Sequence, residues 1–393
     1  MKYKKVIVII SIIVILIGGS TGVLVYFLIQ HNSQNLPQCI AQPFTAYPTN
    51  INKITHIVPL GNLNPPDHTF PTDHMYFITN TTLYPEGLEI FAPGNITIST
   101  LSLITYDPPS GNVSTDYSID FDVCQINSQQ KIGGRFGHLD NLSDYLWNLI
   151  DPFGEEFGDG VYTWEVAGRT YTSYNKQTNL KVDVGKLIAF ACQMGGFDFW
   201  LKDESVYYEF VNTEWTEEFQ HTVSPIAYFR EDLQVVLKDK LQDYWYNPVD
   251  PLGYEGRVDF DIHNTAQGLW VRADYTGRAE ENGLALVYFN FNASQPVFSI
   301  GFAGNSSWDS NVYKYRPKDS GFQDRLFANV TNDDNVYSYI IADIWGTNYD
   351  KAILMKMTSE RELLFMFIDP GGLPLPPDLS SLFDEEQAIR YIR

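Results

Sequence analysis

The chain has 393 residues, with 48 Asp or Glu against 26 Lys or Arg, and its formal net charge is −22 at pH 7. Such an acidic chain is a poor partner for nucleic acid, because phosphate binding needs a basic patch. No Walker, G-x-G-x-x-G or C-x-x-C motif is present, which disfavours the nucleotide-binding and redox classes that use them.

The N-terminal segment predicts a membrane anchor. Residues 6–29 carry no charge and follow a five-residue start with three lysines, whereas residues 31–35 contain no Lys or Arg. A run of this length spans a bilayer core of roughly 30 Å, and the lysines place residues 1–5 in the cytoplasm. The lipid bilayer is therefore an expected partner. The alternative is a signal peptide cleaved near the small residues 18–22. In either case the rest of the chain is exported, and residues 30–50 are expected to form a stalk.

Export permits disulfides and glycosylation. Of three cysteines, Cys124 and Cys192 are the expected pair, because Cys39 falls in the expected stalk. Candidate glycosylation sites of the form N-x-S/T occur at Asn80, Asn95, Asn112, Asn141, Asn292, Asn305 and Asn329.

The exported part is predicted to be mainly β, in two regions. Short runs rich in β-branched and aromatic residues, separated by Gly, Pro, Asn and Asp, predict strands. In the first region, residues 51–246, these runs are 56–60, 75–78, 88–91, 96–100 and 117–123. Helical spacing occurs at residues 142–150 and 231–241. The acidic segment 203–220 lacks periodicity and is expected to be a loop at the rim, outside the sheet.

The second β-rich region, residues 254–372, is expected to be sandwich-like. Its predicted strands are 258–262, 268–271, 284–291, 297–302, 337–344 and 363–368. A Pro-rich stretch follows, and a short amphipathic helix is expected within the tail, residues 373–393.

Histidine and aspartate placement is the strongest sign of chemistry. His68, Asp73 and His74 lie within a short segment that leads into a predicted strand. Further along, His138 ends another β run, and Asp198 lies between aromatics. Imidazole and carboxylate together suit Zn²⁺. Taken singly, each side chain is as well explained by a structural hydrogen bond.

The order of these segments resembles the lysostaphin-type zinc endopeptidases over roughly residues 54–205. The segments 68–73, 92–96, 137–139 and 184–188 resemble that family's first metal motif, hairpin, lone histidine and approach to the last strand. The resemblance implies a β-sheet domain at residues 51–246, with Zn²⁺ held by ligands drawn from His68, Asp73, His74 and Asp198 and with His138 acting in catalysis.

Two departures weaken the catalytic expectation. The first motif is one residue longer than the family's, and the family's H-x-H pair falls here on Gly196 and Asp198. The expected function is therefore a non-catalytic binding or cell-envelope module, with a cell-surface glycan or peptide as its ligand. The alternatives are a zinc-dependent endopeptidase and a structural surface glycoprotein. The 25 Tyr and 8 Trp residues suit stacking on sugars, although β-rich cores also use aromatics.

Overall fold

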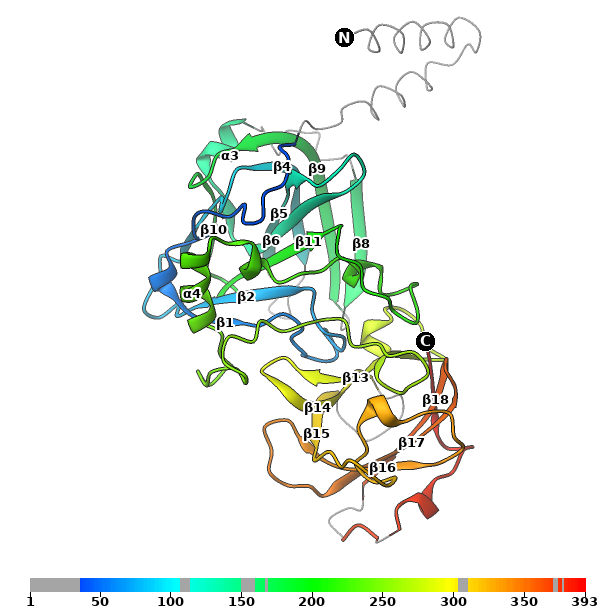
Figure 1. The fold of residues 1–393 in the computed structure, drawn as a ribbon. Helices are drawn as coiled ribbons and strands as arrows, with labels where there is room; N and C mark the ends of the chain where they lie inside the picture. Colours follow the sequence, from blue (N-terminus) through cyan, green and yellow to red (C-terminus); the bar gives the residue numbers. More distant parts are fainter. Residues whose placement is uncertain are drawn as a thin grey trace, which may run out of the picture. The chain divides into compact units, whose positions relative to one another are not determined.

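The computed structural model describes residues 36–106, 114–149, 160–166, 169–302, 310–369, 374–376 and 378–393 (Figure 1). This part is mainly β, which confirms the predicted class. The expected cytoplasmic residues 1–5, the expected anchor at residues 6–29 and the sequons at Asn112 and Asn305 lie outside these ranges. Within them, no helix is long and apolar enough to cross a membrane.

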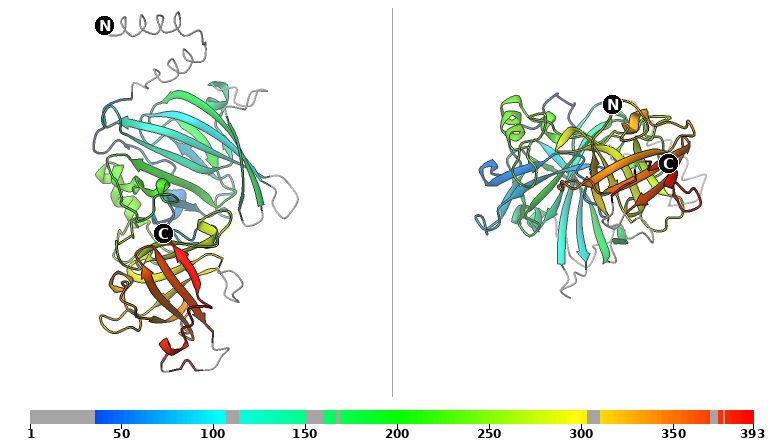
Figure 2. Two further views of the ribbon diagram at one scale, coloured as in Figure 1. Left: turned by 90° about the vertical axis from the view of Figure 1, so that its right-hand side faces the viewer. Right: turned by 90° about the horizontal axis from the view of Figure 1, so that it is seen from below.

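An eight-stranded antiparallel sheet occupies the first region, in the order β1-β2-β11-β6-β5-β4-β9-β8. Its strands are β1 (Ile54–Val58), β2 (His74–Thr79), β4 (Ile96–Tyr106), β5 (Ser114–Gln125), β6 (Lys131–Leu139), β8 (Gly160–Val166), β9 (Arg169–Val182) and β11 (Gly196–Asp203). The long strands β4, β5 and β9 run side by side in Figure 2. Strand β11 is buried at most positions, so it lies inside the packed region.

A smaller sheet and short helices cover this region. The sheet has the order β3-β10-β7, formed by β3 (Leu88–Phe91), β10 (Leu187–Ala191) and β7 (Asn141–Leu142). The helices α3 (Asp144–Leu149) and α4 (Glu231–Asp239) confirm the two helical predictions. The 3-10 helices are η1 (Ile51–Lys53), η2 (Glu217–Phe219), η3 (Pro225–Tyr228), η4 (Glu280–Asn282), η5 (Phe327–Asn329) and η6 (Ser380–Leu382).

The second region is a closed barrel, so the expected sandwich is wrong. Its strands are β12 (Gly268–Arg272), β13 (Gly283–Phe289), β14 (Asn292–Ile300), β15 (Asn311–Tyr315), β16 (Tyr337–Asp343), β17 (Lys351–Ser359), β18 (Glu362–Ile368) and β19 (Ile389–Ile392). The expected C-terminal helix is also wrong, because β19 pairs with both β12 and β18 and closes the barrel. The run 258–262 is irregular instead of a strand, although Val258 and Phe260 are buried.

Aromatic side chains fill one hydrophobic cluster of the barrel, and a second cluster joins the barrel to the sheet. The first contains Trp270, Phe298, Tyr313, Tyr315, Phe327, Tyr339, Phe365 and Tyr391. The second combines sheet residues such as Phe199 with barrel residues such as Leu269 and Val287. One continuous core therefore links the two regions.

The segment 203–220 is not a rim loop. It lies outside the sheet apart from its first residue, Asp203, as predicted, but Phe210 and Phe219 belong to the core shared by sheet and barrel. Thr216 is also buried. Apolar residues at irregular spacing anchor this segment, which explains why a search for periodicity missed its contribution.

The described part of the expected stalk packs on the folded region, which corrects that prediction. Phe44 is fully buried against Phe199 and Phe229. The backbone N–H of Cys39 donates to the carbonyl oxygen of Gln125 at 3.1 Å. This contact brings Cys39 next to β5, where it forms a disulfide with Cys124. The expected Cys124–Cys192 pair is therefore wrong, and Cys192 is a free thiol.

The disulfide gives a first prediction. The sequence separation of 85 residues means that the bond restricts a large loop of the unfolded chain. Cys39→Ser should therefore lower the free energy of unfolding by about 2–4 kcal/mol, whereas Cys192→Ser should change it little. Chemical denaturation measures both. Peptide mapping without reduction should recover Cys39 joined to Cys124, and a Cys124–Cys192 peptide would contradict the structure.

Arg393 gives a second prediction. Its side chain donates to the backbone carbonyl oxygens of Thr265 and Gln267 at 2.6 and 2.9 Å, and its guanidinium lies 4.2 Å from the ring centroid of Trp270. Arg393→Ala leaves buried carbonyls without donors, so unfolding should become easier by about 2–4 kcal/mol. Arg390→Ala is the matched control, since Arg390 is exposed and pairs with Glu362 at the surface. Equal losses of stability in the two variants would contradict the interpretation.

Candidate functional site

Three neighbouring strands bring His74, Asp198 and His138 together. Strand β11 lies between β2 and β6, and Asp198 is opposite Tyr76 on β2 and Gly137 on β6. Alternate residues of a strand share a face, so His74 lies on the same face of β2 as Tyr76. His138 follows Gly137 directly. The register of the sheet thus places side chains that are far apart in sequence around one carboxylate.

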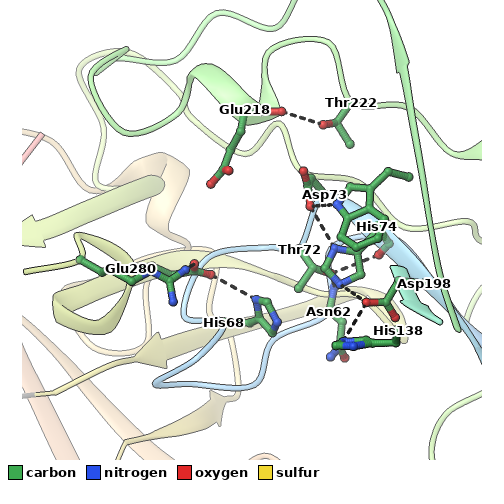
Figure 3. Close-up of polar contacts among 12 residues, drawn as sticks. Asn62, His68, Thr72, Asp73, His74, His138, Asp198, Glu218, Thr222 and Glu280 are labelled. Atoms are coloured by element: carbon green, nitrogen blue, oxygen red, sulfur yellow. Dashed lines mark hydrogen bonds and ion pairs between the residues drawn. The ribbon is translucent and has the colours of Figure 1, made fainter. Parts of the chain in front are cut away.

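The geometry is a row of alternating carboxylates and imidazoles (Figure 3). One carboxylate oxygen, Asp198 Oδ2, lies 3.5 Å from His74 Nε2 and 3.2 Å from His138 Nε2. Each imidazole is held from behind through its other nitrogen. His74 Nδ1 is 2.9 Å from Asp73 Oδ1, and His138 Nδ1 is 2.7 Å from Asp116 Oδ2. Both Nε2 atoms are thereby turned toward Asp198.

Burial leaves two atoms of this row unsatisfied, His74 Nε2 and Asp116 Oδ1. His74 is 5% exposed and Asp198 is 3% exposed. His74 Nε2 is buried without a hydrogen bond to any described residue, because the 3.5 Å separation from Asp198 is a charge contact that is too poorly formed to count as one. Unsatisfied polar atoms are rare in protein interiors, so this one needs an explanation.

Trp200 contacts the end of the row that Asp73 forms. Its indole N–H donates to Asp73 Oδ1 at 2.5 Å, and its ring lies 4.2 Å from that of His74, measured between centroids. A Cβ at Gly137 would lie 2.6 Å from the Trp200 ring, so only glycine permits this approach. Asp73 thus hydrogen-bonds both His74 and Trp200, and it is linked to Asp198 through His74.

His138 has an unusual backbone and an altered pKa. Its φ of 56° lies in the left-handed region, which costs free energy for a residue other than glycine and is frequent at functional sites. The pairing of β5 with β6 is irregular at this point, which turns the side chain toward Asp198. Burial alone would lower the pKa of His138, but the carboxylates of Asp198 and Asp116 outweigh it and raise the pKa to about 9.

His68 stands apart from the row. Its Nδ1 lies 3.5 Å from Glu280 Oε1 in η4 of the barrel region, and Arg278 pairs with the same glutamate at 3.2 Å. The His68 ring is still near the row, at 5.6 Å from that of His74. Burial opposes protonation, but the hydrogen bond and charge of Glu280 raise the pKa of His68.

The predicted site residues therefore come together in part. His74, His138 and Asp198 are in contact, Asp73 supports His74, and His68 faces Glu280 instead of Asp198. Sequence reasoning missed Asp116 and Glu280, since neither belongs to a motif and only folding brings them to the histidines. A side chain at position 196, where the resemblance would place a histidine, is sterically excluded, because a Cβ at Gly196 would overlap the carbonyl oxygen of Phe77.

Two adjoining cavities open on the side of Asp73 and Trp200, and neither is lined by His74, His138 or Asp198. The larger, of about 650 Å³, is lined by residues that include Trp215, Glu218 and Glu280, and the smaller, of about 440 Å³, includes Asp73 and Trp200. Lys202 and Glu218 line both. Figure 3 shows the Glu218 carboxylate directed into the space between Glu280 and Asp73. The crowding of protein around Glu218, together with Asp73 and Glu280, raises its pKa to about 7, although part of the side chain remains exposed to solvent.

The described sequons are all open to solvent. The side chains of Asn80, Asn95, Asn141, Asn292 and Asn329 are exposed or partly exposed. A glycan could therefore be attached at each without unfolding, and glycosylation itself stays a prediction.

Comparisons with known proteins find no relative: no family model matches the chain, and no curated protein or solved structure is similar enough to match. The likeness to lysostaphin-type endopeptidases therefore depends only on the segments quoted from the sequence. The side-chain geometry must carry any functional argument.

Glu218 supplies a prediction of pH dependence. Because folding raises its pKa from 4.5 to about 7, the folded chain holds this proton more tightly than the unfolded chain. The resulting stability is present below pH ~4.5 and is lost as the pH rises through about 7. Glu218→Gln should then stabilise the protein at pH 8 by about 1 kcal/mol, a value reduced by solvent screening. It should have little effect at pH 4.5.

Thermal or chemical denaturation of the variant at both pH values tests this expectation. Glu217→Gln is the matched control, since Glu217 is the exposed neighbour that lines the same cavity. A gain that is the same at pH 4.5 and pH 8 would show that Glu218 is not the cause.

Proposed function

We propose that the chain is an exported, membrane-anchored protein whose sheet carries a zinc-dependent hydrolytic site formed by His74, His138 and Asp198. The observation that carries the proposal is the convergence of two imidazole Nε2 atoms on one carboxylate oxygen, with both Nδ1 atoms held by further carboxylates. Metal-binding histidines are commonly supported in this way.

The distances support this ligand set. Two ligands bound to zinc at 2.0–2.2 Å in tetrahedral geometry are about 3.3–3.6 Å apart. Asp198 Oδ2 lies 3.5 Å from His74 Nε2, within this range, and 3.2 Å from His138 Nε2, just below it. With its ring proton on Nδ1, beside Asp73, His74 would offer the lone pair of its unsatisfied Nε2 to a bound ion.

Among the described residues, no group of three or more His, Cys, Asp or Glu side chains is placed to hold a metal ion. The direct contacts between imidazole and carboxylate occupy the position that an ion would take. Side-chain rotations would replace these contacts by ligand bonds, while Asp73 and Asp116 keep the two rings in place.

Three protein ligands leave one coordination position open, as in catalytic zinc sites. When bound, zinc supplies a Lewis acid and a bound water whose pKa is lowered to about 7. His68 is placed to accept or return a proton, since its ring lies beside His74 and its Nδ1 is oriented by Glu280. The adjoining cavities give room for a peptide or glycopeptide substrate.

Other features support export and anchoring. The Cys39–Cys124 disulfide suits an oxidising compartment outside the cytoplasm. Residues 6–29 would hold the chain in the cell membrane, with residues 1–5 in the cytoplasm and the folded part outside.

A non-catalytic binding module is the second candidate. It is favoured by Gly196, which stands at the first position of the family's H-x-H pair and leaves no room for a histidine there. It is also favoured by the salt-bridged row, which is a self-consistent arrangement of alternating charges without any ion.

Zinc binding tests the proposal. The purified full chain should bind about one equivalent of zinc, and His74→Ala or Asp198→Asn should abolish binding. Asp116→Asn should weaken it 10–100-fold through loss of support for His138. Isothermal titration and metal analysis after dialysis are the measurements.

His263→Ala is the matched control, because His263 is exposed and pairs with Glu360 of the barrel region. Failure to bind zinc, or equal loss in the control, would exclude the site. Zinc binding without cleavage of glycine-rich or cell-wall-like peptides would favour the binding module over the hydrolase.

A further inference from the structure

An exposed group of aromatic side chains lies where the segment after α4 meets the barrel. Its members are Tyr244, Trp245, Tyr246 and Trp345, which are 46%, 55%, 57% and 47% exposed. These four are half of the eight Phe, Tyr and Trp residues that stand out as exposed among the described residues, and they include both tryptophans of that set. Large aromatics are normally buried, so their gathering at one place points to a binding surface.

The four rings are connected through the side chains that they contact, and Tyr244 and Tyr246 both pack edge-on against His56, at 6.4 and 5.2 Å between centroids. Trp245 and Trp345 touch, with centroids 4.1 Å apart and planes inclined by 61°. Trp345 is supported from below by Phe289 at 5.4 Å and Phe291 at 6.3 Å, and Tyr244 packs on Phe291 at 5.4 Å. Both supporting phenylalanines are buried, so the surface has a fixed base.

The backbone holds these rings rigidly. Asp243 is buried, and its Oδ1 accepts hydrogen bonds from the backbone N–H groups of Trp245 and Asn247, both at 2.8 Å. Its Oδ2 accepts from the Asn247 side-chain amide at 2.9 Å. Tyr246 has a φ of 67°, a left-handed conformation that is costly for an aromatic residue and that this tight loop maintains. Little conformational entropy is then lost when a ligand binds.

Charge and polarity restrict the kind of ligand. Asn247, Thr347 and Asn348 are exposed beside the tryptophans and offer neutral amide and hydroxyl groups. The chain as a whole has a net charge of −22, which repels anionic lipids and nucleic acids. A neutral ligand with apolar faces and many hydroxyl groups can pack on the aromatic rings and form hydrogen bonds with the polar side chains around them.

We infer that Tyr244, Trp245, Tyr246 and Trp345 form a platform that binds a neutral oligosaccharide by stacking of its sugar rings. The platform does not depend on zinc. It lies near the histidine row, because the buried Asn62 is next to both Tyr244 and Tyr76, and the Tyr76 ring lies 4.8 Å from that of His74.

Binding of defined oligosaccharides tests the inference. The full chain, purified in a detergent without a sugar headgroup, is titrated with the hexamers of β-1,4-linked N-acetylglucosamine, β-1,4-linked glucose and α-1,4-linked glucose. Tryptophan fluorescence and calorimetry should both report binding of at least one of them. Trp245→Ala and Trp345→Ala should each weaken that binding at least tenfold, and Trp245→Phe, which keeps an aromatic face, should weaken it less.

Tyr162→Ala is the matched control, since Tyr162 is 64% exposed on β8 and lies outside the platform. Unchanged circular dichroism and melting temperature of the variants, together with their retained zinc affinity, would separate this result from failure of folding or of the metal proposal. Absence of binding to all three hexamers would overturn the inference. So would unchanged affinity in the two alanine variants, or binding of phosphatidylcholine vesicles in place of the sugars.

Discussion

The pairing of β11 with β2 on one side and β6 on the other is the constraint on which the candidate site depends. Asp198 can meet two histidines only because its strand is enclosed between the strands that carry them. A change of register by one residue would turn Asp198 to the opposite face of the sheet. Phe197 and Phe199, which are packed in the core on the face of β11 opposite Asp198, prevent such a change.

That register also imposes an electrostatic problem. A carboxylate that is only 3% exposed is costly unless charge or hydrogen bonds compensate it. The two imidazoles compensate Asp198, and Asp73 and Asp116 in turn compensate the imidazoles. The row is therefore a single electrostatic unit. Removal of any member leaves its neighbour without the partner that compensates its charge. This is why variants of the row need a folding control before loss of binding is interpreted.

The parts of this structure that sequence reasoning recovered are those governed by local pattern. Residues 88–91 and 231–239 follow from β-branched runs and from helical spacing, and both elements form as predicted. The closure of the barrel does not follow from local pattern, because β19 is short and β12, the partner that closes the barrel, is distant in the chain. For this reason the sequence around Tyr391 predicts a helical tail, whereas the structure has a strand there.

The candidate site likewise combines residues that the sequence indicates with residues that only the fold brings together. His74, His138 and Asp198 were selected by residue type and order, whereas Asp116 and Glu280 carry no signature of their own. The disulfide was mispaired because Cys39 was assigned to a polar stalk. Phe44, with its neighbours Ile40 and Tyr47, is the sequence feature that could have suggested that this segment packs on the sheet.

The disulfide has a mechanical consequence. Tension applied to the chain from the side of its N-terminus reaches Cys39 before any strand of the sheet. From there the covalent bond transmits the load to β5, an interior strand that is hydrogen-bonded along its length to β4 and β6. Force then acts on an interior strand held on both sides, and not on the terminal strand β1, which would peel away one hydrogen bond at a time. The disulfide therefore makes the sheet more resistant to a pull applied to the chain before Cys39.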